Sequence, residues 1–193
     1  MTTTWRTGID WDRDRFICWD ARPGDALNLL PTPLTYSDIT WRTNSADVVS
    51  LVSRETDYGV SAFYVEAATI YHGLVIGATN GDVVQSIEVQ PSTTYKVAAW
   101  VRGISGYSGV PTYMNAYDED GTWLGAFANI DLTADWQKVT WQFTTTANSQ
   151  YVKLAHALNA APAGTVAFET TGWMLVQGTL PNGFNAGEVS NLY

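Results

Sequence analysis

Three aspartates near the start of the chain alternate with other residues, at Asp10, Asp12 and Asp14. Alternate residues of a β-strand point to one face, so these carboxylates repel one another unless water or a cation separates them. The spacing resembles the first three ligand positions of a calcium-binding loop. Arg15 stands where such loops have glycine, and Ala21 stands where they have glutamate. The alternatives are therefore a metal site and a solvated hairpin whose neighbouring arginines supply the countercharge.

A second group of residues has the chemistry of sugar recognition. In an expected strand over residues 95–102, alternation places one apolar set toward a core and a mixed aromatic and cationic set outward. Phasing the expected strands 112–117 and 151–158 in the same way adds further outward side chains. The result is one predicted surface of six residues: Trp100, Arg102, Tyr113, Asn115, Tyr117 and Lys153. Aromatic rings stack on the C–H faces of sugars, while amides and cations bind hydroxyl groups.

That surface has an alternative occupant, namely protein. The segment 1–34 carries large aromatic side chains but is too short to bury them in a core of its own. We expect these side chains to dock on the main domain or on a neighbouring subunit, together with those of the carboxy-terminal tail. The expected arm contacts are Trp5, Trp11, Phe16, Trp19, Phe184 and Tyr193.

The sequence contains no recognisable combination of nucleophile, base and acid that would indicate catalysis. The chain has two histidines, His72 and His156, and neither lies in a motif with a nucleophile or a metal ligand. Cys18 lies between apolar neighbours, which favours an inert buried thiol over a nucleophile. No zinc-ligand spacing or phosphate-binding loop is present, and nothing marks two carboxylates as a glycosidase pair. The sequence therefore predicts that the protein is not an enzyme.

Composition limits the class of partner. With 193 residues, 46% hydrophobic and 15% charged, the chain is long and apolar enough for one sizeable globular domain. A net charge of -9 repels phosphate backbones and anionic lipids, so we expect neither nucleic acid nor a membrane as a partner. The single cysteine forms no internal disulfide, and the first residues do not resemble a signal peptide. We expect a protein that is made in a cytoplasm and leaves it, if at all, by lysis.

Turn residues separate a series of short segments with strand character after residue 36. No long segment keeps helical periodicity. The expected strands cover residues 39–43, 47–54, 62–67, 73–76, 83–89, 95–102, 112–117, 123–127, 138–145, 151–158 and 165–176. The pattern predicts an all-β fold, an antiparallel jelly-roll β-sandwich with extended amino- and carboxy-terminal arms. The boundaries that we expect are a hairpin arm at 1–34, the sandwich at 35–180 and a tail at 181–193.

Several of these runs resemble carbohydrate-binding modules of the family 4/9/22 type. The matching runs are 87–95, the acidic turn of 116–121, Trp-Gln-Lys-Val at 136–139 followed by Phe-Thr at 143–144, and 166–178. The resemblance covers residues 36–180 and implies a β-sandwich that hosts many roles, glycan binding among them. It also implies a structural calcium ion held by loop carbonyls and carboxylates, at a place that the sequence does not indicate.

The ends of the chain resemble certain bacteriophage tail and other virion proteins. The runs that carry this resemblance are 8–14, 31–36, 174–178 and 184–187. It implies a non-catalytic structural component of a bacteriophage virion, in the tail, that assembles through its arms with copies of itself and other virion proteins. The alternative function is a carbohydrate-binding module that recognises a cell-surface or polymeric glycan through the aromatic surface. The two functions are compatible with each other.

Overall fold

A computed structural model describes most of the expected sandwich. The described residues are 6–10, 15–19, 41–43, 48–54, 60–77, 87–178 and 180. They form strands joined by turns, and none of them is helical. The strands are β1 (Arg6–Asp10), β2 (Arg15–Trp19), β3 (Trp41–Thr43), β4 (Val49–Arg54), β5 (Val60–Ala67), β6 (Gly73–Ile76), β7 (Ile87–Glu88), β8 (Thr94–Ser105), β9 (Thr112–Asp118), β10 (Trp123–Ile130), β11 (Gln137–Thr144), β12 (Tyr151–Leu158) and β13 (Val166–Gln177).

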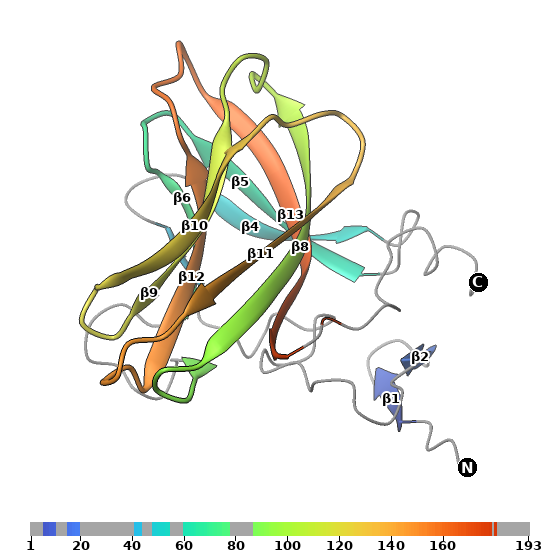
Figure 1. Ribbon diagram of the computed structural model, residues 1–193. Helices are drawn as coiled ribbons and strands as arrows, with labels where there is room; N and C mark the ends of the chain where they lie inside the picture. Colours follow the sequence, from blue (N-terminus) through green and yellow to red (C-terminus); the bar gives the residue numbers. More distant parts are fainter. Residues whose placement is uncertain are drawn as a thin grey trace.

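Two antiparallel sheets pack face to face (Figure 1). In the first sheet the strand order is β10-β9-β12-β6-β3, with β7 also paired to β12. In the second sheet the order is β11-β8-β13-β5-β4. From β8 onward the chain passes from one sheet to the other and back, as in a jelly roll. The predicted all-β, antiparallel sandwich is thus confirmed. The described part of the chain contains no helix long and apolar enough to cross a membrane.

A separate hairpin precedes the sandwich in the chain. β1 pairs antiparallel with β2, and its last residue Asp10 lies opposite Arg15. A hairpin, as expected within the segment 1–34, is therefore present, although only the backbone of its two strands is described. Phe16 and Trp19 belong to β2, and the contacts of their side chains lie outside the described part of the structure. The other expected arm residues are in segments that are not described: Trp5, Trp11, Phe184 and Tyr193.

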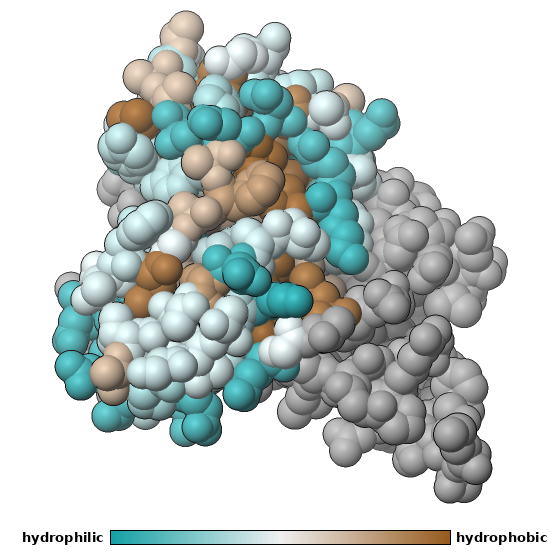
Figure 2. All heavy atoms as spheres, viewed as in Figure 1, coloured by the Kyte–Doolittle hydropathy of each residue, from teal (hydrophilic) through white to brown (hydrophobic). Residues whose placement is uncertain are grey.

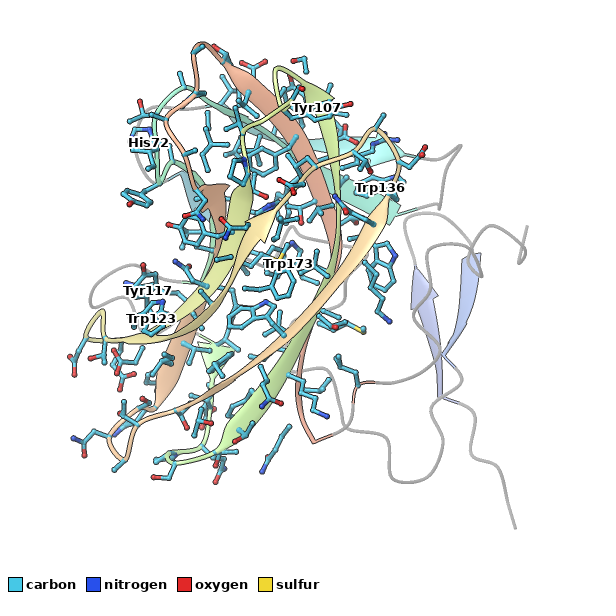
Figure 3. The ribbon with its side chains drawn as sticks, turned by 45° about the horizontal axis from the view of Figure 1, so that its top comes forward. His72, Tyr107, Tyr117, Trp123, Trp136 and Trp173 are labelled. Atoms are coloured by element: carbon cyan, nitrogen blue, oxygen red, sulfur yellow. The ribbon has the colours of Figure 1, made fainter. Side chains whose placement is uncertain are left out.

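The core lies between the two sheets and follows from the alternation of apolar residues. In β8, the inward residues Tyr95, Val97 and Ala99 belong to one large buried cluster, as predicted. Trp173 of β13 is completely buried in this cluster, and Figure 3 shows it between the sheets. A β-bulge between Thr171 and Met174 interrupts the alternation at this point. Gly172, inside the bulge, has a φ of 59°, a value that glycine adopts without strain.

His156 is a buried polar residue in this apolar core. Its Nε2 lies 2.9 Å from the Thr112 hydroxyl oxygen, and its ring centroid is 4.5 Å from that of Phe168. Burial lowers the pKa of His156 to about 3, because a charged imidazolium loses its hydration in this position. The folded protein therefore holds His156 neutral across the pH range in which an exposed histidine becomes protonated.

This burial predicts that the fold becomes less stable in mild acid. Below about pH 6.5 the unfolded chain binds a proton at this histidine, whereas the folded chain does not until the pH approaches 3. The contribution of His156 to the free energy of unfolding is therefore fully present above about pH 6.5, and it is lost as the pH falls below that value. We expect this group to reduce the free energy of unfolding by about 2 kcal/mol between pH 7 and pH 5. Urea denaturation at both pH values, with His156→Gln for comparison, measures it. An equal pH dependence in the two proteins would contradict the prediction.

Candidate functional site

The structure divides the predicted six-residue surface between two sheets. β8, which carries Trp100 and Arg102, pairs with β11 and β13 in the second sheet. β9, which carries Tyr113, Asn115 and Tyr117, pairs with β10 and β12 in the first sheet. The prediction of one continuous surface is therefore wrong. Each outward direction was correct, but the loop 106–111 carries the chain from one sheet to the other, so the two outward faces lie on opposite sides.

On the second sheet, protein covers the outward side chains. Ala98, Trp100 and Met174 form a small buried cluster, with Trp136 and Leu180 packed against it. Trp100 is only 3% exposed, and the Lys138 ammonium lies 5.0 Å from the centroid of its ring. No sugar can stack on Trp100 in this structure. Trp136 and Leu180 cover this face, which agrees with the expectation that protein and not a sugar occupies it. That residues 1–34 also pack there is still a prediction.

Arg102 has a structural role on the same face. Its Nη2 lies 2.8 Å from Glu169 Oε2, and its Nε also donates a hydrogen bond to that oxygen at 2.9 Å. The guanidinium carbon lies 4.6 Å from the centroid of the Trp136 ring. Glu169 is fully buried, so the pair holds a carboxylate that would otherwise be costly to bury. These contacts engage Arg102 within the protein.

The other four predicted residues meet on the outer face of the first sheet. Lys153 of β12 lies opposite Tyr117 of β9, and the next outward pairs along the strands are Ala155 with Asn115 and Ala157 with Tyr113. The two alanines are small, so the side chains around them enclose a cleft of about 230 Å³. We call this the tyrosine cleft. Its lining residues are Tyr71, Leu74, Val75, Tyr113, Asn115, Tyr117, Gly121, Lys153, Ala155 and Ala157.

Two further aromatic residues extend the site. Tyr71 lies in the loop before β6 with a φ of 69°, and its ring meets Tyr113 edge-on at 6.1 Å between centroids. Trp123 of β10 lies opposite Tyr117, and Figure 3 shows the two residues side by side. Trp123 is 62% exposed. Sequence reasoning missed both residues as site residues. The turn at 118–121 was the available signal for Trp123, because a hairpin there brings that residue beside Tyr117.

The cleft offers both stacking surfaces and hydrogen-bonding groups. Asn115 is buried; its Nδ2 donates to the Tyr117 hydroxyl at 3.1 Å, and its Oδ1 has no hydrogen-bond partner among the described residues. Burial, with a smaller contribution from Tyr117, raises the pKa of Tyr113 to about 12, so its hydroxyl keeps its proton at physiological pH. The Lys153 ammonium lies 5.7 Å from the centroid of the Tyr117 ring. The tyrosine rings, the Asn115 amide and the Lys153 ammonium thus all belong to residues that line the tyrosine cleft.

The acidic turn at 118–121 is a hairpin connection between β9 and β10. Its backbone closes with a hydrogen bond from the Gly121 N–H to the Asp118 carbonyl at 3.1 Å. The Asp118 carboxylate accepts a hydrogen bond from the Thr122 N–H at 2.7 Å, and that of Glu119 accepts from the N–H groups of Gln150 and Tyr151. Burial acts to raise the pKa of Glu119, but the backbone N–H groups of Glu119 itself, Gln150 and Tyr151 together outweigh burial and lower the pKa. The carboxylates of Asp118 and Glu119 therefore hold the turn in place.

The predicted metal ligands remain untested. Asp10 ends β1, and only its backbone is described; Asp12 and Asp14 lie outside the described residues. Within the described ranges, no three His, Cys, Asp or Glu side chains come together as a metal site would require. The structural calcium ion implied by the resemblance is therefore still a prediction.

The surface around β10 is also partly apolar. Trp123 and Phe127 of this edge strand are 62% and 41% exposed, respectively. The space-filling view shows apolar residues near the centre of the face on which β10 and β11 lie, with hydrophilic residues around them (Figure 2). Two bulges interrupt the pairing of β10 with β9, and irregular edges of this kind resist pairing with other strands. Trp123 thus lies beside Tyr117 of the tyrosine cleft, whereas Phe127 lies opposite the core residue Met114 on the same edge strand.

Comparison with known proteins identifies the family. A family model described as a carbohydrate binding domain (CBM_4_9) matches residues 37–163. The chain belongs to this family. Its resemblance to carbohydrate-binding modules is thereby confirmed. A comparison with curated protein sequences finds no match.

Solved structures share the fold of this carbohydrate-binding domain. The CBM22-1 xylan-binding domain of Paenibacillus barcinonensis Xyn10C is similar with a TM-score of 0.58 and 13% identity, over 79% of this chain and 96% of that one. TmCBM61, solved with β-1,4-galactotriose, has a TM-score of 0.54 and 16% identity over 79% and 100% of the two chains. The enzymatically active domain of bacteriophage CBA120 tailspike protein 4 has a TM-score of 0.50 and 11% identity, over 78% of this chain and 21% of that one.

Proposed function

We propose that this carbohydrate-binding domain is a non-catalytic module that binds a glycan in the tyrosine cleft. The observation that carries the proposal is the position of Asn115 among the tyrosine rings. Asn115 lines the cleft, and its buried Oδ1 has no hydrogen-bond partner among the described residues. Buried polar atoms are normally hydrogen-bonded, so this oxygen is suited to accept a hydrogen bond from a sugar hydroxyl.

The aromatic groups around Asn115 supply the rest of the recognition. Tyr113 and Tyr117 are half-buried, so neighbouring residues hold each ring in place while part of it remains accessible in the cleft. A sugar that covers these rings buries apolar C–H groups, and the Tyr113 hydroxyl can donate to or accept from its hydroxyl groups. Trp123, exposed beside Tyr117, extends the platform to a neighbouring sugar unit. The solved modules that share the fold include ones described as binding xylan or in complex with galactotriose, which supports a polysaccharide as ligand.

We expect Tyr117→Ala to weaken glycan binding by at least about tenfold, because it removes a ring from the cleft and the partner of the Asn115 amide. A glycan array identifies ligands, and calorimetric titration with the best of them measures the affinity. Tyr113→Ala should have a similar effect. An array without hits, or an affinity that survives both substitutions, would show that the cleft is not the binding site.

Tyr64→Ala is the matched control. Tyr64 is also half-buried and outward-facing, but it lies on β5 of the second sheet, where its hydroxyl donates to Glu66 at 2.7 Å. Its removal should leave glycan affinity unchanged. Trp100→Ala provides a second comparison, because protein covers that residue. If these substitutions weakened binding as much as Tyr117→Ala did, the glycan would bind on the second sheet instead.

As a second candidate function, we propose that the module is a component of a bacteriophage virion, assembled through its terminal arms. The observation in its favour is the apolar cluster on the outer face of the second sheet. Leu180, from the segment that follows β13, packs there with Trp136 beside Trp100. Such a face suits the apolar side chains of residues 1–34, from the same copy or a neighbouring one. The likeness to a bacteriophage tailspike domain supports the same context.

Sedimentation velocity tests this second function. The full chain should associate, and a chain that lacks residues 1–34 should sediment as a monomer. Equal sedimentation of both chains would count against assembly through this arm. Glycan affinity, measured on both, should be the same, because the tyrosine cleft lies on the other sheet.

A further inference from the structure

Lys153 is the charged residue of the tyrosine cleft. It lies on β12, which runs between β9 and β6 in the first sheet, and it faces outward opposite Tyr117. The other residues that line the cleft are aromatic, aliphatic, amide or glycine. Lys153 is half-buried, and its ammonium lies 5.7 Å from the centroid of the Tyr117 ring. A cation is thus held at the place where we propose that the sugar binds.

No carboxylate of the described residues forms an ion pair with Lys153. Gly121 lines the cleft, and the three residues before it are acidic. Two of these, Asp118 and Glu119, form hydrogen bonds elsewhere. The Asp118 carboxylate accepts from the Thr122 N–H and lies 3.4 Å from the Ser149 hydroxyl, while Glu119 binds the backbone of β12 at its start. The chain has nineteen acidic and ten basic residues, yet the described acidic residues provide no ion-pair partner for this cleft cation.

Other cations of the structure show the contrast. Arg102, on the second sheet, is paired with the buried Glu169 at 2.8 Å. Lys138 lies over Trp100 but is exposed to water. Lys153 as a whole is half-buried and lines a cleft, so an anion that binds there is less screened by water than one beside an exposed lysine.

We propose that the glycan bound in the tyrosine cleft is acidic and that a sugar carboxylate forms an ion pair with Lys153. This inference rests on the proposed function and specifies its ligand class. A charge-assisted hydrogen bond from an ammonium to a carboxylate is stronger than one to a neutral hydroxyl. Tyr113 can donate its hydroxyl proton, and the Asn115 amide can accept from a ring hydroxyl of the same sugar. The net charge of -9 repels an anionic ligand at long range, so Lys153 supplies the local attraction that a uronate requires.

Matched acidic and neutral oligosaccharides test the proposal. The probes are oligogalacturonate, oligomannuronate, oligoguluronate and hyaluronan fragments, each also in a form whose carboxyl groups are reduced to alcohols. Xylohexaose and β-1,4-galactotriose complete the set. The full chain should bind at least one acidic probe ten times more tightly than its reduced form. Lys153→Met should lower that ratio at least tenfold, and Lys153→Arg should restore most of it, because arginine keeps the charge.

Lys138→Met is the matched control, since it also removes a lysine that lies over an aromatic ring. It should leave the ratio of acidic to reduced affinity unchanged. Equal binding of acidic and reduced probes, or a ratio that Lys153→Met does not change, would overturn the acidic ligand while leaving glycan binding intact. Binding of neutral probes alone would have the same meaning. Failure of every probe, acidic and neutral, would overturn both the ligand class and the proposed function. Thermal unfolding of each variant shows whether the fold is retained.

Discussion

Replacing Trp173 with alanine is expected to lower the free energy of unfolding by about 3 to 5 kcal/mol. This side chain is completely buried between the sheets, in the cluster that also contains Tyr95 and Phe168. Its loss removes the largest of the fully buried side chains among the described residues and leaves a cavity that neighbours on two packed sheets cannot fill. Urea denaturation followed by far-ultraviolet circular dichroism measures the change at pH 7.

Trp123→Ala is the control for this substitution. It removes the same type of side chain, but from a position that is 62% exposed on β10. A change within about 0.5 kcal/mol is expected there. Trp173→Phe should lie between the two, because phenylalanine fills part of the cavity. Equal losses for Trp173→Ala and Trp123→Ala would mean that Trp173 does not occupy the centre of the core.

Replacing Arg102 with methionine should lower the free energy of unfolding by about 3 kcal/mol, the low end of the range for breaking a buried ion pair. The low end applies because 18% of the Arg102 side chain is exposed, whereas Glu169 is fully buried. The substitution takes the guanidinium away from a carboxylate that remains in the interior, and it also removes the stacking of Arg102 on Trp136. Urea denaturation at pH 7 again measures the loss.

A second substitution distinguishes charge from packing. Adding Glu169→Gln to Arg102→Met removes the buried negative charge, so about half of the lost stability should return. Lys138→Met, which removes an exposed cation from the same sheet, should cost less than about 1 kcal/mol. If the double variant were no more stable than Arg102→Met, packing on Trp136 rather than the Glu169 charge would account for the loss.

The directions of individual side chains could be predicted from the sequence because they depend on local geometry. Successive residues of a strand point to opposite faces, so Val97 and Met114 could be assigned inward, and Tyr113 and Lys153 outward. The structure places all four in this way. Strand positions were predictable for a similar reason, since turn residues such as Gly121 mark the ends of apolar runs.

The neighbours of each strand could not be predicted in the same way. Whether β8 lies beside β9 depends on the path of the loop 106–111 and on the packing of every other strand, which alternation does not encode. Trp100 and Tyr113 were therefore assigned to one surface although they lie on opposite sheets. Tyr71 was missed because a loop brings it to the cleft, held by a hydrogen bond from its N–H to the Leu158 carbonyl at 2.9 Å.

The alanines of β12 have a further consequence for how such a domain changes its ligand. Ala155 and Ala157 form part of the cleft lining, while Val152 and Leu154 of the same strand belong to the core. Substitutions at the two alanines thus change the depth and outline of the cleft, and they leave the core residues of the same strand unchanged. The proposed binding face and the core can therefore change independently of each other in sequence. Such independence allows the same sandwich to acquire new ligands while its interior stays as it is.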